Sequence, residues 1–180
     1  MLGETGHGVQ EHFGLPDDAI DIKMGTLSKA IPSGGGFVAG KSELIDYLRH
    51  HARGYIFSGA PIAPQVAAAQ KGLEILQGQP ERVAKLRRNA ERFTSGIKEL
   101  GYRIPATKSP IVPILFASEQ ETLRATGLCR EHGLFVIPIF YPAVPLNAPR
   151  IRTSVLASHT DEDIDFAIEV FRIVKEKLAS

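Results

Sequence analysis

The sequence predicts an α/β fold, and two observations carry this prediction. Short runs of apolar, strand-forming residues alternate along the chain with longer segments whose apolar residues recur at helical spacing. The chain has 180 residues, of which 43% are hydrophobic, so it is long enough to bury a sizeable core. A break at Gly78-Gln79-Pro80 divides the chain, and we expect two parts, residues 1–78 and 79–180.

The first part contains strands and helices interrupted by glycine-rich segments. Its expected elements, in order, are a loop at 3–14, a strand at 20–24, a turn region at 25–36, a strand at 36–40, and helices at 42–51 and 64–76. Ser42 is the expected N-cap of the first of these helices, because a serine hydroxyl accepts hydrogen bonds from the backbone of the first turn.

The second part predicts a compact α/β unit. Its expected elements are helices at 81–100, 119–132 and 161–178, and strands at 109–116, 133–139 and 150–156. The helix at 81–100 carries one apolar stripe, made of Val83, Leu86, Ala90, Phe93 and Ile97, and an opposite charged face that we expect to be solvated.

Composition limits the function classes. The 21 basic and 20 acidic residues give a formal net charge of +1 without a long run of one sign, so we expect neither nucleic acid nor a membrane as partner. Cys129 is the only cysteine, which excludes an internal disulfide, and we expect it to be a small buried helix residue. No signal-type segment or long apolar run is present, so a cytoplasmic location is expected. We expect no metal site.

Two lysines lie in the glycine-rich stretch between residues 24 and 42. Residues 35–42 match the phosphate-loop pattern G-x-x-x-x-G-K-[ST], which would assign Lys41 to nucleotide phosphates. The context argues against this, because Phe37-Val38-Ala39 reads as a strand and cannot curl its amides around a phosphate. We therefore expect Lys41 to be a surface residue at a turn.

Lys29 has the surroundings that a Schiff-base lysine needs. Two hydroxyl residues, Thr26 and Ser28, precede it, and small residues follow it, so a bulky ligand can approach the backbone. Hydroxyls can hold the phosphate of a cofactor while the amine reaches its carbonyl carbon.

Several segments of the sequence resemble the α-oxoamine synthase family in their order and spacing. They are Gly25-Thr26-Leu27-Ser28-Lys29-Ala30, Gly35-Gly36-Phe37-Val38-Ala39-Gly40, Tyr55-Ile56-Phe57-Ser58, and Arg150-Ile151-Arg152 followed by Ser158-His159-Thr160. These synthases are fold-type I enzymes that use pyridoxal 5'-phosphate (PLP). The resemblance implies the C-terminal part of such a transferase, with a remnant of the PLP-binding large domain at 1–78 and the small α/β domain at 79–180.

The resemblance also implies roles for four residues. Lys29 corresponds to the Schiff-base lysine and general base, and Thr26 to a contact of the cofactor phosphate. Ser58 resembles the hydroxyl residue that reaches this phosphate from the other subunit of a homodimer. Arg152 resembles the arginine that binds the amino-acid carboxylate, a task that suits a planar guanidinium, and we favour it over Arg150.

The implied reaction is acyl transfer to an amino acid. An acyl thioester, carried by coenzyme A or an acyl carrier protein, condenses with the amino acid to an α-amino ketone while PLP acts as the electron sink. The family motif Asp-Glu-Ala-His-Ser is expected upstream of Met1, so we expect the chain to correspond to the C-terminal half of a synthase. Pro32 stands where the family usually has glycine, and Gly59 replaces a hydroxyl residue beside Ser58.

Three alternative functions stay open. The chain could be a catalytically inactive fragment of such an enzyme, which the missing motif would favour. It could also be a PLP-dependent aminotransferase, although residues 140–152 favour a synthase. The third alternative is a nucleotide-binding module at Gly35 to Ser42, which rests on the phosphate-loop pattern alone.

Overall fold

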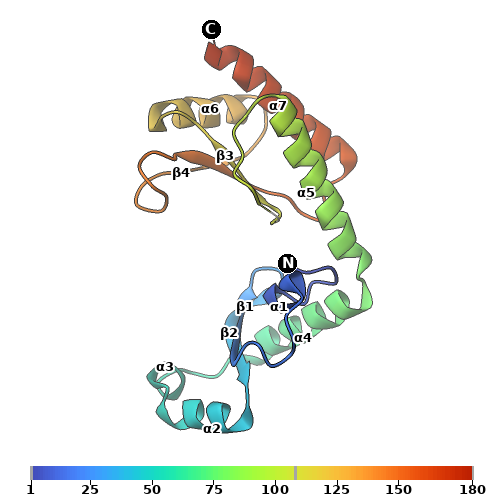
Figure 1. Ribbon diagram of the computed structural model, residues 1–180, viewed down its shortest axis with the longest axis vertical. Coiled ribbons are helices and arrows are strands. Elements are labelled where there is room, and N and C mark those ends of the chain that lie inside the picture. The colour runs from blue at the N-terminus through green and yellow to red at the C-terminus, as the bar shows by residue number, and fades with distance from the viewer. Residues whose placement is uncertain (1, 108, 180) are drawn as a thin grey trace. The chain divides into compact units, whose positions relative to one another are not determined.

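The computed structural model describes residues 2–107 and 109–179 of the chain. The chain folds into two compact units, Met1–Glu81 and Arg82–Ser180, each with helices and a small sheet of its own (Figure 1). In the described part of the chain, no helix combines the length and the apolar character needed to cross a membrane.

The first unit is built on an antiparallel hairpin of two strands. Its elements are α1 (Val9–Phe13), β1 (Ile22–Ser28), β2 (Pro32–Gly40), α2 (Ser42–His51), α3 (Arg53–Ile56) and α4 (Ala63–Gly78). Helix α4 packs against β2. β2 begins at Pro32, a position that suits a residue without a backbone N–H.

Several sequence-based expectations for the first unit are wrong. Residues 9–13 form the short helix α1 rather than a loop, and residues 53–56 form α3, a helix that was not predicted from the sequence. Strand β1 continues to Ser28, beyond the expected end at residue 24, and β2 begins at Pro32 rather than at residue 36, because the two strands pair across the expected turn region. The N-cap of α2 is Lys41 rather than Ser42, and no side chain caps this helix.

The second unit has one three-stranded sheet and three helices. Its elements are α5 (Glu81–Glu99), which begins at the last residue of the first unit, β3 (Ile111–Leu115), α6 (Glu119–Glu131), β4 (Ile137–Ile139), β5 (Arg150–Ser154) and α7 (Asp161–Ala179). The strand order is β3-β5-β4, and β5 pairs antiparallel with both neighbours. The edge strands each contain a proline, Pro113 and Pro138, which a central strand would not accommodate.

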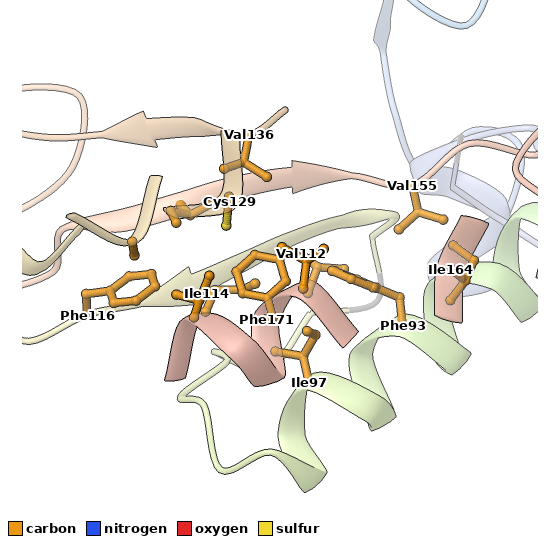
Figure 2. Packing of buried hydrophobic residues seen from close by; sticks show 14 residues of the cluster. Phe93, Ile97, Val112, Ile114, Phe116, Cys129, Val136, Val155, Ile164 and Phe171 are labelled. Atoms are coloured by element: carbon orange, nitrogen blue, oxygen red, sulfur yellow. The ribbon is translucent and has the colours of Figure 1, made fainter. Parts of the chain in front are cut away.

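One apolar core holds the second unit together. Alternate residues of the sheet point to the same face and meet helices α5, α6 and α7 there, as the close view of the packing shows (Figure 2). Phe171 of α7, Ile97 of α5, and Ile114 of β3 are fully buried. Val83, Phe93 and Ile97 of the predicted α5 stripe are buried as expected.

Candidate active site

Lys29 lies at the turn of the β1–β2 hairpin. Ser28, the last residue of β1, pairs with Pro32, the first residue of β2, and Lys29 follows directly after this strand. The side chain of Lys29 is exposed and forms no hydrogen bond or ion pair with the residues that the structure describes. A primary amine is therefore presented to solvent at a defined point of a hairpin.

Two hydroxyl groups lie beside this lysine. Thr26 and Ser28 point to the same face of β1, because they are two residues apart in a strand, and their hydroxyl oxygens are 3.0 Å apart. The Thr26 hydroxyl also donates to the carbonyl oxygen of Gly35 at 3.4 Å. Both residues are exposed, so their hydroxyls can turn to bind an anion.

The glycines of β2 allow the two strands to approach closely at this end of the hairpin. Thr26 pairs with Gly36, and a Cβ atom at Gly36 would lie 2.8 Å from the carbonyl oxygen of Gly25. The register shifts between Thr26 and Ser28, so that β2 bulges over Ser33–Gly35. Gly35 in this bulge has a φ of 80°, which side chains disfavour. The glycine cluster thus shapes the backbone beside Lys29.

Helix α4 anchors the hairpin turn. Ile31 is 8% exposed, and Gly72 of α4 lies so close that a Cβ there would stand 3.3 Å from Cγ2 of Ile31. The Ser33 hydroxyl donates to the carbonyl oxygen of Gln65 at 2.6 Å. These contacts hold the turn that carries Lys29 against α4, a helix of the same unit.

Ser58 lies after α3, and the structure does not bring it to the hydroxyl pair at Thr26. Its backbone N–H donates to the carbonyl oxygen of Tyr55 at 3.2 Å, and its side chain is exposed. The role of Ser58 toward the cofactor phosphate of another subunit stays a prediction.

Arg152 lies on β5 of the second unit, in register between Pro113 of β3 and Ile137 of β4. Its side chain is exposed and has no hydrogen-bond or ion-pair partner in the described ranges. Arg150, the competing residue, is tied back to its own loop, because its Nε donates to the carbonyl oxygen of Ala148 at 3.0 Å. The arrangement leaves Arg152 as the guanidinium that is available to a ligand.

Arg152 lines a cavity of about 440 Å³ beside Ile137, the first residue of β4. Its wall is mixed, with Phe93, Phe135, Ile137 and Phe166 as apolar groups and His159 as a polar one. A carboxylate bound to Arg152 would thus lie beside apolar side chains.

The structure contradicts the hypothesis of a phosphate loop at residues 35–42. Phe37, Val38 and Ala39 pair with Gly25, Met24 and Lys23 in the hairpin ladder. The segment is therefore extended, and its amides do not curl into a phosphate cradle. Lys41 occupies the N-cap position of α2 without a capping side-chain hydrogen bond, and it is exposed, as expected for a surface residue.

Cys129 is buried in α6, as the sequence predicted, and burial raises the pKa of its thiol to about 12. The thiolate is the reactive form, so this cysteine is inert in the folded chain. In the described ranges, no group of three or more histidine, cysteine or acidic side chains could hold a metal ion.

Asn89 is a buried residue that sequence reasoning missed. It is 3% exposed and lies one helical turn before Phe93 on α5, inside the apolar stripe. A polar residue at the period of a core face is the signal that could have identified it, because a buried amide requires partners.

A lysine with two hydroxyls at a hairpin turn, in an α/β chain that also carries an arginine-lined cavity, is compatible with a PLP enzyme. A sequence model of the family described as aminotransferase class I and II matches residues 3–171, which is most of the chain. A high-resolution structure of serine palmitoyltransferase (SPT) with PLP matches with a TM-score of 0.93 at 28% identity, over 99% of this chain and 45% of that one. The SPT of Sphingomonas wittichii matches with a TM-score of 0.92 at 26% identity and the same coverage. The fold is therefore that of part of a fold-type I PLP enzyme.

Curated relatives define the family within this class. The 8-amino-7-oxononanoate synthase of Petrotoga mobilis is 42% identical over 180 residues, which are 100% of this chain and 46% of the relative. The serine palmitoyltransferase of Sphingobacterium spiritivorum is 41% identical over 177 residues, which are 98% of this chain and 44% of the relative. The chain belongs to the α-oxoamine synthase family of the class I and II aminotransferases. It spans somewhat less than half the length of these relatives.

Proposed function

We propose that the chain supplies the lysine-bearing part of a PLP-dependent acyltransferase that condenses an amino acid with an acyl thioester to an α-amino ketone. The thioester is carried by coenzyme A or an acyl carrier protein. The observation that carries this proposal is Lys29, free of partners among the described residues, at the turn of a hairpin that also presents Thr26 and Ser28. Membership of the α-oxoamine synthase family supports the reaction class.

The residues present fit PLP. Its aldehyde needs a primary amine, which Lys29 offers, and its phosphate needs hydrogen-bond donors, which Thr26 and Ser28 offer at the same end of β1. When bound, PLP supplies an electron sink that stabilises negative charge on the α-carbon of the substrate. Lys29 then serves as the base that takes the α-proton onto Nζ, because its amine is the basic group at the turn.

Arg152 binds the carboxylate of the amino acid in this proposal. Its guanidinium can donate two parallel hydrogen bonds to the two carboxylate oxygens, which orients the substrate as well as binding it. Ser58 would hold the cofactor phosphate of the other subunit in a homodimer. The first unit then corresponds to the C-terminal part of the PLP-binding large domain, and the second unit to the small domain.

A PLP titration of the purified chain tests the proposal. We expect a visible absorbance band, and borohydride should fix the cofactor on the peptide that contains Lys29. Lys29→Ala should abolish both signals, whereas Lys41→Ala, which removes an exposed lysine in the same unit, should keep them. Trapping that persists in Lys29→Ala, or no trapping in a folded chain, would overturn the assignment.

A further variant, tested with two compounds, examines the Thr26 hydroxyl. Thr26→Val keeps the shape of the side chain but removes its hydrogen-bonding capacity, so PLP should bind more weakly by about 1 kcal/mol or more. Pyridoxal, which lacks the phosphate, should lose nothing from the same substitution. An equal loss for both compounds would show that Thr26 does not contact the phosphate.

A further inference from the structure

Asn89 of α5 binds the loop that leaves β5. Its amide nitrogen donates to the carbonyl oxygens of Leu156 and His159, both at 3.0 Å. Asn89 is 3% exposed, so these two hydrogen bonds are shielded from water. The loop between Arg152 and α7 is therefore held at two points by one side chain.

His159 is held in one orientation by the same loop. The backbone N–H of Leu156 donates to Nδ1 of His159 at 3.3 Å, and the N–H of His159 contacts the carbonyl oxygen of Leu156 at 3.4 Å. Because Nδ1 accepts this hydrogen bond, Nε2 is the ring nitrogen that can donate one. The remaining polar group of the ring is thus a donor.

His159 lies in the wall of the cavity that Arg152 also lines. His159 and Arg152 line the same cavity, as does Phe93, the neighbour of Asn89 one turn along α5. The charged group that could compete there is Asp163, and its carboxylate is engaged with the N-terminus of α7, where it accepts from the N–H of Thr160 at 2.9 Å. The cavity therefore combines a guanidinium with a second hydrogen-bond donor.

We propose that His159 is a second substrate-binding residue, which donates from Nε2 to the carboxylate that Arg152 binds, and that Asn89 is the residue that positions it. The inference rests on the proposed function, because the ligand is the carboxylate of the amino-acid substrate. It assigns the segment Ser158-His159-Thr160 to substrate recognition, and it makes Asn89 act through His159 rather than touch the ligand.

The tautomer of His159 gives the first test, and it needs no ligand. A long-range proton–nitrogen NMR spectrum of the full chain should show the His159 ring with its proton on Nε2. Asn89→Ala should produce a mixture of tautomers, because the loop loses both anchors. Tyr102→Phe is the matched control, since it removes another hydrogen bond from a side chain to a backbone carbonyl, that of Phe171, in the same unit. An unchanged tautomer in Asn89→Ala would overturn the positioning role.

Binding of L-alanine, with L-alaninamide as the control that lacks the carboxylate, gives the second test. His159→Phe keeps a ring of similar size, and we expect it to weaken alanine binding about tenfold, while Asn89→Ala weakens it about threefold. Tyr102→Phe should leave it unchanged. If Arg152→Gln weakens alanine binding but His159→Phe does not, the inference about His159 fails alone. If Arg152→Gln has no effect, or the unchanged chain does not distinguish alanine from its amide, the proposed substrate site itself fails.

Discussion

The second unit encloses a core to which three helices and the sheet contribute, whereas the first unit buries almost none of its apolar residues. In the described part of the first unit, the buried hydrophobic residues are Ile31 and Ala69, each 8% exposed. Large side chains of its strands and loops, such as Met24 at 76% and Phe57 at 81%, lie open to solvent. The unit that carries the proposed lysine is thus the one that gains less stability from burial of its own apolar side chains.

This difference has an energetic meaning. Each buried Val, Leu, Ile or Phe side chain contributes about 1.5–3 kcal/mol relative to an exposed one, so the second unit gains stability from its packing that the first unit lacks. Large exposed apolar surfaces are typical of sites where another protein surface binds. We therefore expect the second unit to unfold cooperatively and the first to be held by a few identifiable contacts.

The largest expected effect comes from the centre of the second core. Phe171 is fully buried and contacts the rings of Phe93 and Tyr102 edge to face. Phe171→Ala should lower the free energy of unfolding of this unit by about 3–5 kcal/mol, through lost transfer energy and a cavity. Unfolding in denaturant, monitored through the reactivity of the Cys129 thiol, measures this change in free energy.

Phe57→Ala is the matched substitution in the first unit. Because this ring is exposed, its loss should change the free energy of unfolding by less than about 0.5 kcal/mol. Equal effects of the two substitutions would contradict the contrast between the units.

The next effect concerns the contact that anchors the hairpin. A Cβ atom at Gly72 would lie 2.9 Å from Cδ of Pro32, so Gly72→Ala should push the turn with Lys29 away from α4. We expect a cost of about 1–3 kcal/mol, typical of overpacking, seen as faster hydrogen exchange in β1 and β2. Gly78→Ala, in the same helix with no atom near the added Cβ, should be neutral or stabilising. Similar exchange rates in both variants would show that α4 does not hold the hairpin.

The long helices could be predicted from the sequence because their apolar period is strong. Helix α7 was expected at 161–178 and runs over Asp161–Ala179, and α5 begins at the expected residue. Helices α1 and α3 were missed because four or five residues are too short to show a period. The end of β1 was misplaced because it depends on pairing with β2, which local sequence does not specify.

In the candidate site, too, some features could be predicted from local sequence and others required the fold. Lys29 could be predicted as the candidate lysine from its neighbours in sequence, since its small and hydroxyl residues are local, and its role stays a prediction. That Arg152 is free while Arg150 is bound to Ala148 could not be read from the sequence, because both residues lie on one strand two positions apart. The partners of Asn89 are about 70 residues away, so its role required the fold.

An effect that depends on pH is expected in the second unit at high pH. Burial raises the pKa of the Cys129 thiol from 9.0 to about 12. The unfolded chain therefore releases this proton first as the pH rises, and the stability of the unit should fall between pH 9 and 12. Cys129→Ala should flatten this part of the pH profile of unfolding. A profile with the same slope in both proteins would show that the thiol does not contribute.

The smallest effect is expected at low pH in the first unit, where one carboxylate orders the N-terminal loop. Glu11 accepts hydrogen bonds from the Thr5 hydroxyl at 2.7 Å and from the backbone N–H groups of Thr5 and His7, both at 2.9 Å. Hydrogen bonding, first of all from the Thr5 hydroxyl, lowers the pKa of Glu11 from 4.5 to about 2. The stabilisation is present above pH 4.5 and is lost as the pH falls toward 2, because protonation removes the charged acceptor.

Glu11→Gln should reproduce this loss at neutral pH, with faster hydrogen exchange at the amides of Thr5 and His7. The exposed Glu43, which forms no hydrogen bond with the described residues, provides the control substitution Glu43→Gln. Exchange in the second unit should not respond to the Glu11 substitution, since the hydrogen bonds of Glu11 are to residues of the first unit. If Glu11→Gln left the two amides as protected as before, the order of this loop would have to come from its glycine-rich backbone rather than from the carboxylate.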